Sequence, residues 1–210
     1  MRHDELAHLC ELAYNDDVKL WSFNTHKIFD VETDTQCFLL YNATLQIVVF
    51  RGTELSLTNW TDVITDLKIK PYNGVHEGFQ KAFNSIKTEL LSELDFDIKT
   101  IFCGHSLGGA LAILAYNTFE VLDKTCVTFG APRVYQKDLA EFLKENGEDF
   151  YIFRYENLID PVTFLPPLSF GYRHIGTPLT ESNPLPFFFS TLSHKLKSHS
   201  ITTYIKALKK

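Results

Sequence analysis

The stretch Ile101-Phe102-Cys103-Gly104-His105-Ser106-Leu107-Gly108-Gly109-Ala110-Leu111-Ala112 decides the fold. Gly104, Ser106 and Gly108 form the pattern Gly-x-Ser-x-Gly, with an apolar strand-like segment before it and a small-residue helical segment after it. This order is typical of a nucleophile elbow, in which a serine occupies a sharp turn between a strand and a helix. Glycine removes Cβ atoms that would collide in so tight a turn. The pattern therefore predicts an exposed hydroxyl above a helix N-terminus, whose free N–H groups suit an oxyanion.

Strand-like segments alternate with amphipathic segments along most of the chain. Such an alternation, with helices of about 10–16 residues, predicts an α/β fold with a mostly parallel central sheet and helices on both faces. We expect a turn at 42–44 and irregular segments at 54–75 and 182–195. The expected strands are 36–41, 45–50, 100–103, 126–129, 150–155, 172–175 and 177–180, and the expected helices are 4–14, 78–94, 107–122, 135–145 and 201–208.

Length and charge restrict the class of protein. At 210 residues the chain is most simply a single domain, 1–210, with one sizeable core. Its net charge of −6 argues against a nucleic-acid partner, because phosphate binding needs clustered Lys and Arg. The same charge disfavours broad electrostatic docking on anionic membranes.

The N-terminus and the cysteines bear on location. Residues 1–5 are polar and lack the apolar core of a signal peptide, and no apolar run approaches the roughly 20 residues that span a bilayer. The cysteines lack metal-ligand spacing and are expected to be reduced core residues. These features predict a cytoplasmic protein without a transmembrane segment or metal, although a mature form of a secreted precursor stays open. The cysteines are Cys10, Cys37, Cys103 and Cys126.

A serine hydroxyl needs a base, and on an elbow fold the chain order is Ser, then Asp or Glu, then His. This order leaves His174, His194 and His199 as candidates. We favour His199, since it directly precedes the apolar stripe of the last expected helix. His174 falls inside an apparent strand, where a structural hydrogen bond is the commoner role, and His194 lies in the segment before His199.

The partner acid should follow a strand at the carboxyl edge of the sheet. Asp160 follows the strand at 150–155 by a short loop and opens the proline-rich segment 160–167, whose prolines would hold a carboxylate in place. Asp123, Asp138 and Asp149 suit capping or solvated positions instead. Asp160 could also simply start a turn, as Asp-Pro often does.

An oxyanion hole needs two donors. One is the backbone N–H of Leu107, the residue after the serine. Thr53, in Phe50-Arg51-Gly52-Thr53 after an earlier strand, is the candidate for the second, because it offers both an N–H and a hydroxyl. A plain strand-ending turn is the alternative reading of this segment.

Several motifs between residues 50 and 200 occur in the order in which a known family carries them. On these motifs the chain resembles the class 3 lipases, the fungal-lipase-like branch of the α/β-hydrolases, over most of its length. Together they are far more specific than the elbow alone. The motifs are Phe50-Arg51-Gly52-Thr53, Val75-His76-Glu77-Gly78-Phe79, Gly104-His105-Ser106-Leu107-Gly108-Gly109-Ala110, Thr128-Phe129-Gly130-Ala131-Pro132-Arg133, Asp160-Pro161-Val162 and His199-Ser200.

The resemblance implies an α/β-hydrolase fold and a serine ester hydrolase that acts on lipid acyl esters without a metal or cofactor. It implies Ser106 as nucleophile, Asp160 as acid and His199 as base, with the oxyanion hole as above. His174 matches the family's non-catalytic histidine, and His76 and Gly78 match structural positions. A triacylglycerol lipase, a carboxylesterase, a phospholipase and a polysaccharide-ester esterase would share this triad, and a non-catalytic lipid-binding scaffold is the rival from another class.

The chain departs from the family pattern in two segments. After Thr53, residues 59–67 spread out a short Trp–Asp–Leu pattern, so that Asp62 and Asp66 are both candidates for its aspartate. A lid there would be small. The aromatic loop 184–189 could wall an acyl groove, contact a lipid surface transiently or cap the core. The candidate lid or substrate-binding residues are Leu55, Leu57, Trp60, Phe187 and Phe188.

Overall fold

The computed structural model describes residues 1–53, 71–181 and 197–209. Within these ranges, strands and helices alternate as the sequence predicts. In chain order the elements are α1 (His3–Ala13), β1 (Asn24–Asp30), β2 (Thr35–Tyr41), β3 (Leu45–Phe50), β4 (Pro71–Tyr72), β5 (Val75–His76), α3 (Glu77–Glu93), β6 (Lys99–His105), α4 (Leu107–Thr118), β7 (Lys124–Phe129), β8 (Tyr135–Gln136), α5 (Lys137–Glu145), β9 (Ile152–Asn157), the 3₁₀ helices η1 (Pro161–Phe164) and η2 (Leu168–Phe170), β10 (Tyr172–Arg173), β11 (Thr177–Glu181) and α7 (Ile201–Leu208).

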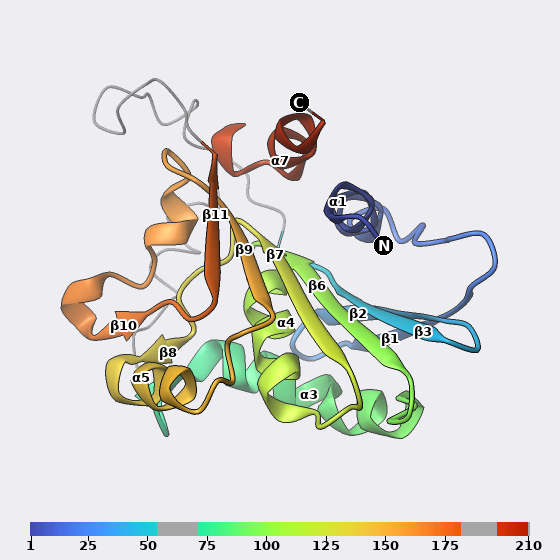
Figure 1. Cartoon of the computed structure of the whole chain (residues 1–210), viewed down its shortest axis with the longest axis horizontal. Coiled ribbons are helices and arrows are strands. Elements are labelled where there is room, and N and C mark those ends of the chain that lie inside the picture. Colours follow the sequence, from blue (N-terminus) through green and yellow to red (C-terminus); the bar gives the residue numbers. More distant parts are fainter. Residues whose placement is uncertain (54–70, 182–196, 210) are drawn as a thin grey trace.

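The main sheet has seven strands in the order β1-β2-β3-β6-β7-β9-β11 (Figure 1). The strands from β3 to β11 pair in parallel, and β1 and β2 add an antiparallel edge. A smaller antiparallel sheet has the order β10-β8-β5-β4. The predicted mostly parallel central sheet is therefore confirmed.

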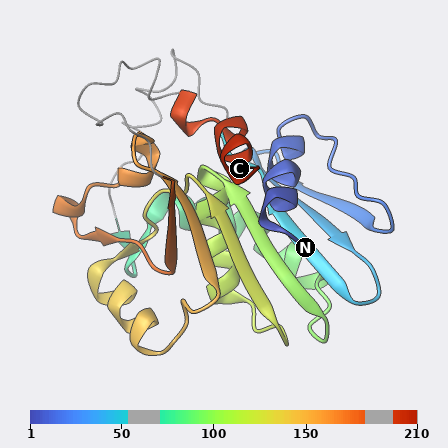
Figure 2. The same ribbon diagram turned by 45° about the horizontal axis from the view of Figure 1, so that its top comes forward.

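Helices cover both faces of this sheet. Helices α1 and α7 lie side by side on one face, and α3 and α4 lie on the other (Figures 1 and 2). The pleat of β3 shows how the sequence achieves this, because successive side chains point to opposite faces. Ile47 and Val49 join the cluster under α1 and α7, whereas Val48 and Phe50 join the cluster under α3 and α4.

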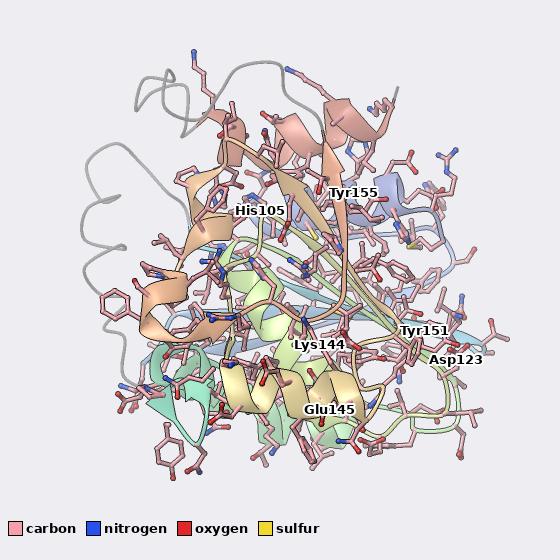
Figure 3. The ribbon with its side chains drawn as sticks, turned by 60° about the vertical axis from the view of Figure 1, so that its left-hand side comes forward. His105, Asp123, Lys144, Glu145, Tyr151 and Tyr155 are labelled. Atoms are coloured by element: carbon pink, nitrogen blue, oxygen red, sulfur yellow. The ribbon has the colours of Figure 1, made fainter. Side chains whose placement is uncertain are left out.

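The parallel strands bring their carboxyl ends to one edge of the sheet. His105 ends β6 at this edge, and Tyr155 of β9 lies level with it on the other side of β7, in the upper half of Figure 3. Asp123 and Tyr151, which precede β7 and β9, lie at the opposite edge, in the lower right. Ser106 follows His105 directly, so the elbow lies where ligands bind in open α/β sheets.

Several expectations need correction. The segment predicted to be irregular at 54–75 contains β4 and the first residue of β5, and the helix predicted at 135–145 begins at Lys137, after β8. The helix predicted at 107–122 ends at Thr118, because Phe119 leaves the helix and packs between Phe83 and Phe102, with ring centroids 5.9 and 6.2 Å away. Strand β1 was not predicted, since among its residues only Ile28 is buried. Its seven-residue pairing with β2 supplies the hydrogen bonds that its composition does not indicate. No helix in the described ranges has both the length and the apolarity to cross a bilayer.

Candidate active site

Ser106 lies between β6 and α4 in the tight turn that the sequence predicts. Its backbone has φ 57° and ψ −129°, a conformation that side-chain-bearing residues rarely adopt. Such strain occurs where the surrounding structure fixes it, typically at functional sites.

The elbow glycines explain how the turn closes. A Cβ on Gly104 would lie 2.2 Å from the carbonyl carbon and oxygen of Gly108. A Cβ on Gly108 would lie 2.2 Å from the carbonyl oxygen of Phe50, at the end of β3. Both contacts are with backbone, which cannot move aside cheaply. The two glycines therefore allow α4 to start directly beneath Ser106.

The structure brings Ser106, His199 and Asp160 together at this edge. His199 Nε2 lies 2.8 Å from Ser106 Oγ, and His199 Nδ1 lies 2.8 Å from Asp160 Oδ2. The carboxylate can only accept, so Nδ1 carries the proton and Nε2 is left to accept the serine proton. All three residues are buried, so the predicted exposure of the serine hydroxyl is wrong. The arrangement can withdraw a proton from a serine hydroxyl and stabilise the resulting imidazolium.

Asp160 receives more donors than the sequence analysis foresaw. The Val162 N–H donates to Oδ1 at 2.9 Å, and the Tyr204 hydroxyl donates to Oδ2 at 2.6 Å. The sequence pattern indicates Tyr204 only as part of an apolar helix stripe. The signal that could have found it is a hydroxyl-bearing residue on that stripe, five residues after His199. A buried tyrosine hydroxyl needs a partner, and here the partner is the carboxylate.

Gly130 is a second residue of the site whose role its sequence context does not indicate. It follows β7 with φ +59°, and a Cβ there would lie 2.7 Å from Asp160 Oδ2 and 3.2 Å from His199 Nδ1. Glycine at this position therefore leaves room for the carboxylate–imidazole pair.

The side chains of His174 and Arg133 donate hydrogen bonds to the loop after Asp160. His174 Nε2 donates to the Thr163 carbonyl at 2.8 Å, and Arg133 donates to the carbonyls of Phe164 and Pro166. Burial lowers the pKa of His174 well below its ordinary value, and the nearby Arg154 guanidinium lowers it further. A neutral His174 bonded to this loop has the structural role that its sequence context favoured.

Two charged side chains, the buried Arg154 and the partly buried Glu156, lie near His174. The Arg154 guanidinium contacts Glu156, whose Oε1 lies 3.4 Å from His174 Nε2. Burial raises the pKa of the Glu156 carboxyl, although Arg154 acts on it in the opposite direction. His76, the other histidine of the family motifs, is buried and stacks on Phe79 with 4.2 Å between ring centroids.

Thr53 and Leu107, the expected oxyanion donors, border one cavity of about 270 Å³. Thr53 is exposed, and Leu107 is the first residue of α4. Gly52 lets this turn approach the elbow, because a Cβ there would lie 2.4 Å from the backbone carbonyl oxygen of His105. The remaining lining residues are Asp34, Thr35, Arg51, Gly52 and Leu111.

Other candidates lie outside the described residues. Among the residues that the structure does describe, no group of three or more His, Cys, Asp or Glu side chains is arranged to hold a metal ion. The candidates outside the described ranges are Leu55, Leu57, Trp60, Asp62, Asp66, Phe187, Phe188 and His194.

Comparison with known proteins adds sequence relatives. Residues 47–170 match the model of the family described as Lipase (class 3). A lipase of Rhizomucor miehei is 32% identical over 156 residues, which cover 65% of this chain and 42% of that protein. The secreted mono- and diacylglycerol lipase 1 of Fusarium solani is 30% identical over 149 residues, covering 63% and 43%. The match thus spans less than half the length of these curated relatives.

Solved structures show the same fold. The triacylglyceride lipase of Rhizomucor miehei superposes with a TM-score of 0.68 at 23% identity, covering 85% of this chain and 77% of that one. A mono- and diacylglycerol lipase of Aspergillus oryzae gives a TM-score of 0.61 at 30% identity, covering 83% and 70%. The fold is therefore that of the α/β-hydrolases, as predicted.

The predicted cytoplasmic location is wrong. The relatives from Fusarium solani and Penicillium cyclopium are named as secreted lipases. The prediction depended in part on unpaired cysteines, and all four cysteines are indeed free and buried. A buried thiol is shielded from oxidants by its packing, so it does not report the compartment.

Proposed function

Because this chain belongs to the class 3 lipases, we propose that it is a serine hydrolase that cleaves acyl esters of lipids. One observation carries the proposal: the His199 imidazole joins Ser106 Oγ to Asp160 Oδ2 through two contacts of 2.8 Å. We assign Ser106 as nucleophile, His199 as base and Asp160 as the acid that orients it. Thr53 and Leu107 supply the oxyanion donors in this proposal.

In the first half-reaction Ser106 Oγ attacks the ester carbonyl carbon while His199 Nε2 takes the hydroxyl proton. The carbonyl oxygen becomes an oxyanion, which accepts hydrogen bonds from the Leu107 N–H and from Thr53. The carbon–oxygen bond to the alcohol then breaks, and His199 passes its proton to the leaving alcohol oxygen. An acyl-enzyme and a free alcohol result.

In the second half-reaction a water molecule takes the place of the alcohol. His199 removes one water proton as the water oxygen bonds to the acyl carbon, and an oxyanion forms again. The bond to Ser106 Oγ breaks, and His199 returns the proton to the serine. The products are a carboxylic acid and the free enzyme.

The substrate class follows from the relatives together with the site. The relatives are named as triacylglyceride and mono- and diacylglycerol lipases, so neutral acylglycerols are the first substrates to test. Phe164, Leu168 and Phe170 closely follow Asp160 along the chain and are 44%, 54% and 52% exposed. These apolar side chains support a transient contact of the site with a lipid surface. We also propose one domain, since both hydrophobic clusters pack on the same sheet.

Hydrolysis of a short-chain p-nitrophenyl ester tests the proposal. Ser106→Ala should abolish turnover, while Ser92→Ala, which changes an exposed helix serine, should leave it unchanged. His199→Ala should lose far more activity than His174→Ala. Retained turnover in Ser106→Ala would overturn the proposal. A wild type that hydrolyses no ester would instead favour a non-catalytic lipid-binding scaffold.

A second measurement separates the ester classes. Rates on acylglycerol and phospholipid esters of increasing chain length should be compared below and above the critical concentration of each ester. A rise in rate at the lipid interface, with acylglycerols preferred, supports a neutral lipase. Preference for phospholipids identifies a phospholipase on the same triad, and preference for short soluble esters identifies a carboxylesterase.

A further inference from the structure

His105, the residue between Gly104 and the serine, has contacts that the triad does not explain. It is buried at the end of β6 (Figure 3), and both of its ring nitrogens are hydrogen-bonded. Nε2 lies 2.6 Å from the backbone carbonyl oxygen of His199, and Nδ1 lies 2.7 Å from the Tyr14 hydroxyl. Its ring also packs on the His199 ring, with 4.6 Å between centroids and a 31° tilt.

The hydrogen-bond partners of His105 determine which of its two ring nitrogens carries the proton. A carbonyl oxygen can only accept, so His105 Nε2 carries a proton and donates it to His199. Burial lowers the pKa of His105 well below its ordinary value, and the neighbouring His199 lowers it further. A neutral imidazole carries one proton, so Nδ1 is bare and accepts from Tyr14. The hydrogen bonds therefore run in one direction, from Tyr14 through His105 to the His199 backbone.

The main chain around His199 is tied to the rest of the site by a few bonds. Asn157 Nδ2 donates to the Ser198 carbonyl at 3.3 Å, and Ser198 Oγ donates to the Ile159 carbonyl at 3.1 Å. These bonds tie residue 198 to the strand and loop before Asp160. The bond from His105 ties residue 199 to the elbow that carries Ser106. It therefore controls the separation of the base from the nucleophile.

Tyr14 connects the hydrogen bond between His105 and His199 to α1 and to the turn that carries Gly52 and Thr53. It caps the C-terminus of α1, a helix that packs against α7. A Cβ on Gly52 would lie 2.4 Å from the Tyr14 hydroxyl oxygen, so this hydroxyl fits against the turn that precedes Thr53. Tyr14 lies outside residues 47–170, the segment that matches the family model, so its contact with His105 is not part of that match.

We propose that Tyr14 and His105 are positioning residues for the base: Tyr14 holds His105 as the neutral Nε2–H tautomer, and His105 holds the His199 main chain so that Nε2 stays within reach of Ser106 Oγ. The inference rests on the proposed function, since it needs His199 to act as base. A neutral His105 also places no cation against the imidazolium that forms on His199 during catalysis. Misplacing a catalytic group by about 1 Å can cost 10²-fold in rate.

Three variants test the proposal, with kcat expressed per serine titrated by a fluorophosphonate. His105→Phe keeps a ring but removes both nitrogens, and we expect kcat to fall by about 10- to 100-fold with little change in KM. His105→Gln keeps an amide donor for the His199 carbonyl and should recover most of the loss. Tyr14→Phe removes one hydroxyl and should lower kcat by about 3- to 10-fold, whereas Tyr41→Phe, an exposed control, should match the wild type.

Titrating the serine separates positioning from folding. A purely structural role would reduce the number of reactive serines and leave kcat per titrated serine unchanged, and this result overturns the proposal. A His105→Gln variant as slow as His105→Phe also overturns it. The double variant Tyr14→Phe with His105→Phe should lose no more than His105→Phe alone, because Tyr14 acts through His105.

The tautomer can be read directly in the wild-type protein. The ¹⁵N chemical shifts of His105 should show a protonated Nε2 and a bare Nδ1 from pH 8 down to pH 6, and a proton on Nδ1 would overturn the proposal. If the wild type neither hydrolyses esters nor labels at Ser106, the proposed function fails and this inference fails with it. Wild-type turnover with an unaffected His105→Phe variant overturns this inference alone.

Discussion

The Tyr204 hydroxyl donates a hydrogen bond of 2.6 Å to Asp160 Oδ2. The carboxylate is completely buried, so donors have to replace the water that it would otherwise bind. Burial raises the pKa of Tyr204 well above its ordinary value, and the adjacent Asp160 raises it further. The hydroxyl therefore stays protonated, and α7 supplies a donor to Asp160 one turn after the helix begins.

Removing this donor should destabilise the protein. Hydrogen bonds to charged groups contribute about 1.5–3 kcal/mol, so Tyr204→Phe should lower the free energy of unfolding by about that amount. Urea denaturation of Tyr204→Phe beside the exposed control Tyr41→Phe measures the effect. Equal stability of the two variants would show that the bond contributes nothing.

The elbow glycines give a second prediction. Gly104→Ala places a Cβ 2.2 Å from the Gly108 backbone, and the overlap should lower the free energy of unfolding by more than about 3 kcal/mol. Gly78→Ala is the matched control, because this glycine lies in α3 and a Cβ there would come no closer than 3.3 Å to the His76 ring, so its effect should stay within about 1 kcal/mol. Similar unfolding midpoints for the two variants would contradict the crowded elbow.

His174 predicts a pH dependence of stability. Its pKa is lowered in the folded protein, so the unfolded chain binds its proton first as the pH falls below about 6.5. The free energy of unfolding should therefore be fully retained above pH 7 and fall towards pH 5, by at most about 1.4 kcal/mol per pH unit from this residue. His174→Gln keeps a donor for the Thr163 carbonyl and cannot titrate, so its slope should be shallower. Parallel slopes in the two proteins would refute the assignment.

Substitutions of Thr53 test whether its hydroxyl is a donor of the oxyanion hole. If its hydroxyl stabilises the oxyanion, Thr53→Val should lower kcat by about 10²-fold or more with a smaller change in KM. Thr53→Ser retains the hydroxyl and should stay close to the wild type. Equal rates for the two variants would mean that Thr53 contributes at most its backbone N–H.

The fold could be predicted from the sequence where a local pattern of residues determines the backbone. Ser106 and its two glycines lie on a turn whose sequence is dictated by backbone crowding, and this predicted the central strand and helix. Strand β1 escaped prediction because an edge strand needs few apolar residues, with Ile28 alone buried in it. The end of α4 was not predictable because Phe119 leaves the helix and packs between Phe83 and Phe102, which are distant in sequence.

Within the candidate site, chain order and flanking elements indicated His199 and Asp160, which the structure places beside Ser106. Chain order and flanking elements do not indicate Tyr204, Gly130 or Tyr14, although the hydroxyl on an apolar helix stripe is a weak signal for Tyr204. Each acts through a contact with residues far away in sequence, and each sits in a local pattern with an ordinary explanation, such as a helix stripe or a strand-ending turn. Only the folded chain brings them to the carboxylate and to His105.

The central claim is that His199 activates Ser106 as a nucleophile. The most direct test is to react the protein with a fluorophosphonate and locate the adduct by mass spectrometry, in the wild type and in His199→Ala. We predict one adduct on Ser106 in the wild type and very slow labelling in His199→Ala. An adduct at another residue, or equal labelling rates in the two proteins, would contradict the claim.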